Sequence, residues 1–191
     1  MDNKIVLLVG VGGQGTILAG DLLAKAAAAS GFDVKISEIH GMSQRGGSVS
    51  TVVSFGHDVH TMIADEGCAD VVVSFEAIEA LRNQQYLAAG GTMFVNDEEI
   101  VPVSVNIGAA QMPTDTHERL EELGATLINA GQIAREVGSP KSTNVVLMGA
   151  LSTALPFEEE TWRDVIAKRV PPKTIDANLA AFAAGRKAVG A

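Results

Sequence analysis

Cysteine is almost missing from this chain, which has only Cys68 among its 191 residues. A disulfide within the chain is therefore impossible. An iron–sulfur cluster held only by cysteines needs about four thiolates, so this chain alone cannot hold one. Cys68 directly precedes an apolar stretch, and we interpret it as a small buried hydrophobic residue rather than a nucleophile.

Aromatic and basic residues are also scarce. Aromatic side chains make up 4% of the sequence, and 14 Lys and Arg residues face 23 Asp and Glu residues, which gives a formal net charge of −9. Binding to nucleic acid or to an anionic membrane surface depends on clustered positive charge, and the sequence contains no such cluster. We therefore expect no nucleic-acid partner and no membrane partner.

The sequence lacks long apolar runs and metal-ligand spacings. No apolar run approaches the roughly 20 residues of a membrane span, and the first residues show no signal-peptide pattern, so we expect a cytoplasmic protein. The acidic turn at residues 97–99 has no neighbouring His or Cys, and we interpret it as solvated. No metal site is predicted, because the histidines are not spaced as ligands; they are His40, His57, His60 and His117.

Short apolar stretches alternate with amphipathic ones along most of the chain, which predicts an α/β fold. We expect a Rossmann-like open, mostly parallel sheet with helices on both faces and a helical C-terminal third. The predicted strands cover residues 4–9, 33–38, 48–55, 59–64, 70–75, 92–96 (after a break at Gly90-Gly91), 101–107 and 125–129. The predicted helices cover residues 16–30, 76–81, 114–123, 130–137, 144–155, 161–169 (behind a capping box at 161–164) and 175–189. All belong to one predicted domain over residues 1–191, with an α/β core at 1–155 and C-terminal helices at 156–191.

A glycine-rich loop, Gly10-Val-Gly-Gly-Gln-Gly15, stands between the first predicted strand and the first predicted helix. It matches the G-x-G-x-x-G pattern of dinucleotide-binding loops. Glycines let backbone N–H groups approach a ligand closely, and the following helix points its positive dipole end at the same place. We predict an anion site, such as a phosphate site, at Gly10, Gly12, Gly13, Gln14 and Gly15. The alternative is that the glycines serve only a tight turn and close packing.

A second polar, glycine-rich loop covers residues 39–47, after the predicted strand 33–38. Ligands of open α/β sheets bind beyond the carboxyl ends of the strands, so we expect the two loops to be neighbours. Arg45 can offer several donors to a carboxylate or phosphate, and Ser43 and Gln44 can add neutral hydrogen bonds. The alternative is a solvated loop with a surface arginine.

Together the two loops resemble the gamma-type subunits of 2-oxoacid:ferredoxin oxidoreductases. Within that family, Gly41-Met-Ser-Gln-Arg-Gly-Gly47 is most similar to the small (beta) subunits of indolepyruvate ferredoxin oxidoreductases. The resemblance continues through residues 48–55 and 70–76. It returns where the family has an Asn followed by a Gly-Ala pair, here Asn144 and Gly149-Ala150. It covers roughly the full chain, but its specific part is the N-terminal portion with the two loops.

The resemblance implies a subunit that is inactive alone. The larger alpha subunit of such a complex carries thiamine diphosphate, Mg²⁺ and iron–sulfur clusters. The complex decarboxylates a 2-oxoacid, here an aryl pyruvate such as indolepyruvate, passes electrons to ferredoxin and forms an aryl-acetyl-coenzyme A. This chain holds none of these cofactors alone and completes the active site or the coenzyme A surface. By resemblance, Gly12, Gly13, Gln14 and Gly15 form the anion-facing loop, and Ser43, Gln44 and Arg45 form the second loop. No catalytic residue is predicted.

The alternative function is a stand-alone NAD(P)- or flavin-dependent oxidoreductase, with Glu38 on a ribose hydroxyl. Against it, Glu38 runs directly into a polar loop, and no Tyr-Lys or His-Asp pair for hydride transfer follows. Trp162 lies far from both loops in the sequence, which argues against flavin stacking. We therefore favour the subunit, and exposed apolar partner surface would favour a homodimer when the chain is isolated.

Overall fold

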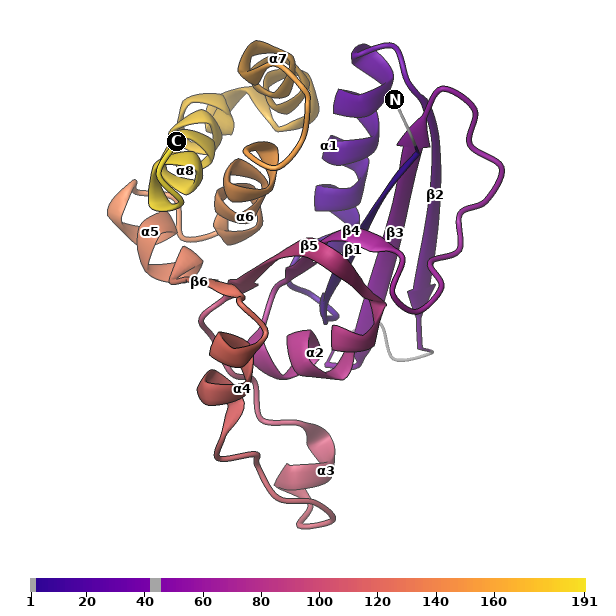
Figure 1. Ribbon diagram of the computed structural model, residues 1–191. Coiled ribbons are helices and arrows are strands. Elements are labelled where there is room, and N and C mark those ends of the chain that lie inside the picture. Colours follow the sequence, from indigo (N-terminus) through magenta and orange to yellow (C-terminus); the bar gives the residue numbers. More distant parts are fainter. Residues whose placement is uncertain (1–2, 42–45) are drawn as a thin grey trace.

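The computed structural model describes residues 3–41 and 46–191. A central sheet stands beside a layer of helices, and a small arm around α3 projects from one end (Figure 1). The strands are β1 (Lys4–Val11), β2 (Asp33–His40), β3 (Ser48–Gly56), β4 (Ala69–Ser74), β5 (Leu87–Asn96) and β6 (Thr126–Ile128). The helices are α1 (Thr16–Ala29), α2 (Ala77–Arg82), α3 (Val103–Asn106), α4 (Thr116–Glu122), α5 (Ala130–Glu136), α6 (Thr143–Ser152), α7 (Glu159–Arg169) and α8 (Ile175–Ala188), with 3₁₀ turns η1 (Gln84–Tyr86) and η2 (Pro172–Thr174).

The sheet is mixed, with the strand order β2-β3-β1-β4-β5-β6. β3 runs antiparallel to both of its neighbours, whereas β1, β4, β5 and β6 pair in parallel. All strands except β3 therefore share one direction, and their carboxyl ends lie at one edge of the sheet. This arrangement confirms the predicted α/β fold. The continuously apolar β4 lies between the parallel neighbours β1 and β5, as is typical of a strand in the middle of a parallel sheet.

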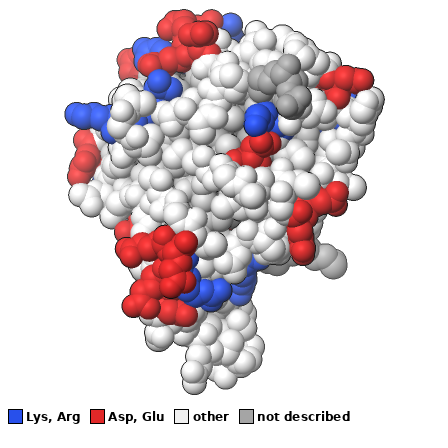
Figure 2. All heavy atoms as spheres, viewed as in Figure 1, with Lys and Arg blue, Asp and Glu red and all other residues white. Residues whose placement is uncertain are grey.

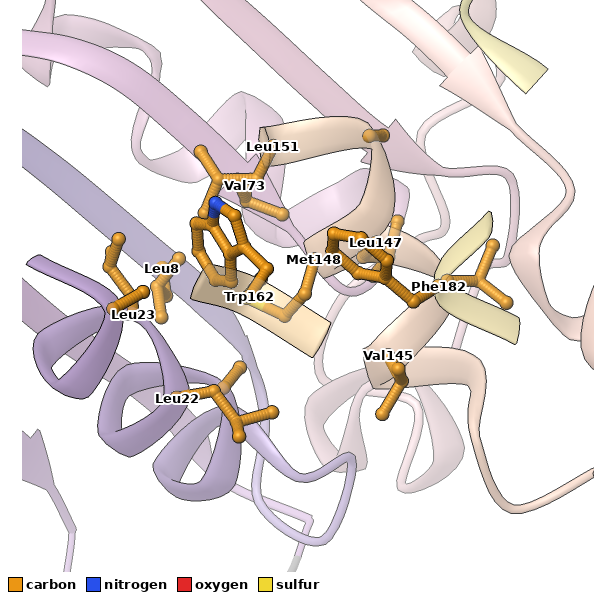
Figure 3. Packing of buried hydrophobic residues seen from close by; sticks show 14 of the residues in the cluster. Leu8, Leu22, Leu23, Val73, Val145, Leu147, Met148, Leu151, Trp162 and Phe182 are labelled. Carbon is orange, nitrogen blue, oxygen red and sulfur yellow. The ribbon is translucent and has the colours of Figure 1, made fainter. Parts of the chain in front are cut away.

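Alternation along β1 divides the core into two layers. Val6 and Leu8 face the larger layer, which contains α1 and α5 to α8, whereas Leu7 and Val9 face a smaller layer with α2 and α4. Helices thus cover both faces of the sheet, as predicted. Figure 3 shows the larger layer, where side chains of four helices and two strands meet: Leu8, Leu22, Leu23, Val73, Val145, Leu147, Met148, Leu151, Trp162 and Phe182. This layer joins residues from both 1–155 and 156–191, and the single domain remains a prediction.

Helix α6 is buried along almost its whole length because it is apolar on every side. It packs against β4 and β5, and it also touches α1, α5 and α8. The approach to α8 is closest at Gly149 and Gly185, where a Cβ atom would overlap with backbone of the facing helix. Glycine at both positions lets the two helix backbones come into contact.

Two predicted strands are wrong. Residues 59–64 form no strand, because β1 and β2 already occupy both edges of β3 and leave no edge for a returning hairpin. Residues 101–107 contain the helix α3 instead of a strand. Pro102 stands at the N-terminal boundary of α3, where the missing N–H of proline costs no helical hydrogen bond.

Three finer predictions also differ from the structure. Gly90-Gly91 lies inside β5, where the pairing with β4 shifts register, so the glycines form an irregularity rather than a break. Helix α7 begins at Glu159 with Glu158 as its N-cap residue, ahead of the predicted capping box. Cys68 is exposed, because it belongs to the turn before β4 and burial begins with Ala69.

Candidate functional site

The glycine loop joins the carboxyl end of β1 to the N-terminus of α1. Gly13 and Gly15 have positive φ angles of 109° and 88°, which other residues adopt at a cost. Among the residues that the structure describes, a Cβ atom on Gly13 would meet nothing within 4 Å. Helix α1 has no side-chain N-cap and no acidic residue in its first turn. Its first N–H groups and its dipole are therefore available to an anion.

Gln14 folds back onto the backbone of its own chain. Its Oε1 accepts a hydrogen bond from the Val11 N–H (2.8 Å), and its Nε2 donates to the Phe75 carbonyl (2.9 Å). The side chain thus ties the end of β1 to the end of β4. Gly10 packs at the same place, because a Cβ atom on it would lie 2.8 Å from Gln14 Oε1 and from Phe75 Cβ. Gly10 and Gln14 therefore shape the loop from within.

The second loop lies directly beside the glycine loop, as predicted. The Gly12 N–H donates to the Gly47 carbonyl (2.8 Å), and the Gly46 N–H donates to the Gly12 carbonyl (3.2 Å). Gly46 and Gly47 thus place the returning end of the second loop at the site. Ser43, Gln44 and Arg45 lie outside the described residues, and their roles remain predictions.

A cavity of about 300 Å³ opens between the glycine loop, the start of α1 and the ends of β2 and β3. Gly12, Gly13, Gly15 and Thr16 form one wall, and Glu38 lies on the other. Glu38 pairs with Thr51 of β3, so an antiparallel strand separates its strand from β1. A dinucleotide fold places the ribose-binding acid on the strand next to β1. The strand order therefore departs from what the stand-alone alternative requires.

A second cavity, of about 430 Å³, lies on the other side of the glycine loop. Gly13 and Gln14 line it together with Lys141 and Asn144 at the start of α6. A Cβ atom on Gly15 would lie 2.7 Å from Asn144 Nδ2, so the starts of α1 and α6 are packed together. Two helix N-termini and Lys141 thus face this cavity and favour negative charge, whereas the Glu98 carboxylate, which also lines it, opposes negative charge.

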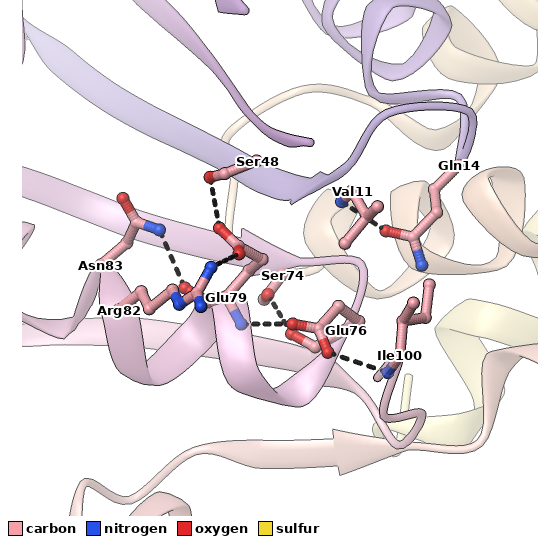
Figure 4. A network of polar contacts seen from close by, with 9 residues as sticks. All are labelled: Val11, Gln14, Ser48, Ser74, Glu76, Glu79, Arg82, Asn83 and Ile100. Atoms are coloured by element: carbon pink, nitrogen blue, oxygen red, sulfur yellow. Dashed lines mark hydrogen bonds and ion pairs between the residues drawn. The ribbon is translucent and has the colours of Figure 1, made fainter. Parts of the chain in front are cut away.

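Two buried carboxylates form a polar cluster beside the second loop (Figure 4). Glu76 accepts hydrogen bonds from the N–H groups of Glu79 (2.5 Å) and Ile100 (3.3 Å). Glu79 accepts from the Ser48 hydroxyl (2.5 Å) and from Arg82 (2.8 Å). Burial raises the pKa of Glu76, and the neighbouring charge of Glu79 acts in the same direction. The cluster therefore holds both the start of β3 and the segment that follows β5.

Sequence reasoning missed Lys141, Glu76 and Glu79 as residues near the site. Lys141 reaches the glycine loop only through the packing of α6 against α1, which no short-range pattern encodes. Glu76 was assigned only as the start of a helix. Its position directly after the buried strand β4 was the available signal, because residues after such strands lie at the ligand-binding edge.

Comparison with known proteins decides between the two alternatives. The chain matches the model of the pyruvate ferredoxin/flavodoxin oxidoreductase family over residues 5–188. The chain belongs to this family. The chain is 46% identical to indolepyruvate oxidoreductase subunit IorB of Thermococcus kodakarensis. The match covers 98% of this chain and 96% of the Thermococcus subunit.

Two solved structures share the fold of this family member. The gamma subunit of a keto/oxoacid ferredoxin oxidoreductase from Geobacter sulfurreducens superimposes with a TM-score of 0.72 and 26% identity, over 98% of this chain and 99% of the other. A 2-oxoglutarate:ferredoxin oxidoreductase from Magnetococcus marinus, with 2-oxoglutarate, coenzyme A and succinyl-CoA bound, gives a TM-score of 0.73 and 22% identity. That match covers 98% of this chain and 31% of the other.

These relatives confirm the resemblance that the two loops carry: this family member is a gamma-type subunit of a 2-oxoacid:ferredoxin oxidoreductase. In residues 3–41 and 46–191, no group of His, Cys, Asp and Glu is arranged to hold a metal ion. No helix in these ranges is both long enough and apolar enough to cross a membrane.

Proposed function

We propose that this chain is the small subunit of an indolepyruvate-type 2-oxoacid:ferredoxin oxidoreductase, and that its glycine-loop edge completes the coenzyme A surface of the larger subunit. The observation that carries the proposal is the joining of the glycine loop to the second loop through Gly12, Gly46 and Gly47. The similarity to indolepyruvate subunits at 46% identity supports the substrate class.

The chemistry of this edge suits the phosphate groups of coenzyme A. The N–H groups of Gly13 and of the first turn of α1 can donate to phosphate oxygens. Lys141 and the start of α6 add positive potential from the second cavity, where a phosphate would bind on the side away from Glu98. The Glu38 carboxylate repels phosphate and accepts hydrogen bonds from hydroxyl groups. We therefore assign phosphate to the Gly13 side and a ribose hydroxyl to the Glu38 side.

The larger subunit supplies the redox chemistry in this proposal. That subunit would hold thiamine diphosphate with Mg²⁺, which would supply the decarboxylation chemistry, and iron–sulfur clusters, which would supply electron transfer to ferredoxin. This chain contributes orientation: its fixed backbone donors hold the anionic end of coenzyme A so that the thiol reaches the partner's site. Arg45 is assigned to a phosphate or to the oxoacid carboxylate. A cytoplasmic location and a homodimer of the isolated chain remain predictions.

Reconstitution with the larger subunit tests the proposal. Gly13→Ala places a methyl group in the open mouth of the cavity, whereas Gly31→Ala introduces the same type of backbone strain far from it. Both glycines have positive φ and open surroundings, so the two variants are matched. We expect both to lose about 1–2 kcal/mol of stability.

Only Gly13→Ala should raise the KM for coenzyme A, by about ten-fold or more, through lost hydrogen bonds to a charged group. The assay is indolepyruvate-dependent ferredoxin reduction by the complex. The proposal fails if the chain does not associate with the larger subunit. It also fails if the chain binds NAD or NADP tightly on its own and Glu38→Ala abolishes that binding.

A further inference from the structure

The segment from Ile100 to Thr114, which we call the apolar arm, contains no charged residue. It includes α3, and none of its residues is buried. The side chains of Val101, Val103 and Ile107 are 45%, 63% and 73% exposed. A concentration of large aliphatic side chains on a protruding segment marks a site of contact with another protein.

The arm stands away from the body of the protein. Figure 1 shows α3 beyond the end of the sheet, and Figure 2 shows an uncharged lobe at the same place. Within the arm, the Val105 and Ala109 N–H groups donate to carbonyls of Pro102 and Ser104. The arm thus has its own hydrogen-bonded shape, and a partner can bind it without first ordering it.

Two polar contacts fix the arm to the body. At its base, the Ile100 N–H donates to Glu76. The neck of the arm is where the chain leaves the body and returns to it. There, Asp97 Oδ1 and His117 Nε2 lie 2.7 Å apart and join the segment before the arm to the segment after it. The arm therefore projects in a defined direction.

Most of the charged residues around the neck of the arm are acidic. Asp97, Glu98 and Glu99 precede the arm, and Asp115 and Glu118 follow it. Arg82 lines the cavity at its base, and Arg119 is the nearest Lys or Arg in sequence. Figure 2 shows an acidic patch to one side of the uncharged lobe, with Lys or Arg side chains between the patch and the lobe. An apolar tip with an acidic collar is complementary to an apolar cleft whose rim carries Lys and Arg.

The base of the arm adjoins the candidate site. Pro102 and Val103 line a cavity of about 320 Å³ together with Gly46, Gly47 and Glu79. A protein bound to the arm would therefore lie next to the second loop.

We propose that the apolar arm inserts into an apolar cleft, rimmed by Lys and Arg, on the larger subunit of the oxidoreductase. This inference rests on the proposed function, which supplies that partner. A second copy of this chain is a poorer occupant, because it would bring another acidic collar and a net charge of −9 toward the first.

The test measures the Kd between the full chain and the larger subunit of its complex. Val103→Asp and Ile107→Asp add a charge at exposed positions and leave the fold intact, which circular dichroism verifies. We expect each to weaken binding at least about ten-fold, as expected for anchors at the centre of an interface. Ala183→Asp is the control, since Ala183 is exposed on α8, which lies away from the arm in Figure 1, and its Kd should stay within about two-fold.

Salt provides a second measurement. The association rate of the wild type should fall as ionic strength rises, and Glu99→Gln should reduce that dependence. Equal Kd values for Val103→Asp and Ala183→Asp would overturn the arm proposal and leave the proposed function standing. A wild-type chain that forms a homodimer which Val103→Asp dissociates would also overturn it. A wild-type chain that does not bind the larger subunit would defeat the proposed function itself.

Discussion

Two uncharged stretches of this chain have opposite environments. Residues 142–157 contain α6, whose side chains are buried between the sheet and three helices. The apolar arm, residues 100–114, is equally free of charge, yet it contains no buried residue. Lack of charge therefore does not predict burial by itself. What differs is continuity: α6 is one uninterrupted apolar helix, whereas Pro102, Gly108 and Pro113 divide the arm into pieces too short to cover a sheet.

The largest contrast is expected from matched truncations in the two stretches. Leu147→Ala in α6 opens a cavity at a position with no exposure, and it should reduce the free energy of unfolding by about 3 kcal/mol. Ile107→Ala in the arm should change it by less than about 0.5 kcal/mol. Urea denaturation of both variants gives the comparison. Similar losses at the two positions would mean that the arm packs against the body.

The next effect concerns the contact between α6 and α8. Gly149→Ala places a methyl group against the Phe182 carbonyl, and the resulting separation of the helices should cost about 2–3 kcal/mol. Gly131→Ala in α5 is the control, because a Cβ atom there meets only Arg135 at 3.6 Å. It should stabilise the protein by up to about 1 kcal/mol through helix propensity. A neutral Gly149→Ala would show that the two helices can part without loss.

A smaller effect lies at the base of the arm. Burial raises the pKa of Glu76 above its usual value of 4.5, so its ionised form is less favourable in the folded state. The protonated Glu76 side chain makes its full contribution to stability below pH 4.5, and this contribution is lost as pH rises through the raised pKa. Glu76→Gln should therefore lose less stability than the wild type between about pH 4.5 and pH 7. Parallel curves of unfolding free energy against pH for the two proteins would contradict this.

The smallest effect is expected at the neck. The hydrogen bond to Asp97 raises the pKa of His117 above 6.5, with help from the charges of Glu99 and Glu121. The protonated pair stabilises the fold below pH 6.5, and the contribution disappears as pH rises through the raised pKa. Because the pair is exposed, His117→Gln should remove only about 0.2–1 kcal/mol, measured by thermal unfolding at low salt. No difference at about pH 6 would show that this pair does not hold the arm.

Local patterns in the sequence predicted most elements because their cause is local. The apolar runs that form β1 and β4 and the amphipathic stretch that forms α1 each follow from residue spacing alone. The position of β3 does not, since it depends on which strand edges pair across the molecule. Because β3 lies between β2 and β1, residues 59–64 have no free edge of β3 to pair with, and Glu38 on β2 is not next to β1.

The candidate site was likewise predicted only where it is local. The two loops and their adjacency follow from their places after two strands that share a direction. The inward turn of Gln14 does not, because it is directed by Phe75 at the end of another strand. Nor does the contact between Gly15 and Asn144, since these residues are brought together only by the finished core.

The cover that α6, α7 and α8 place over one face of the sheet has a consequence during synthesis. The ribosome synthesises α1 and the strands before the last quarter of the chain. The ion pair between Asp21 of α1 and Arg169 of α7 therefore joins a segment made early to one made late. Until then, a large apolar surface faces the surrounding medium. Nascent chains that stop before residue 143 are therefore expected to aggregate or to recruit chaperones. Release of the complete chain is the step that makes the subunit available for assembly.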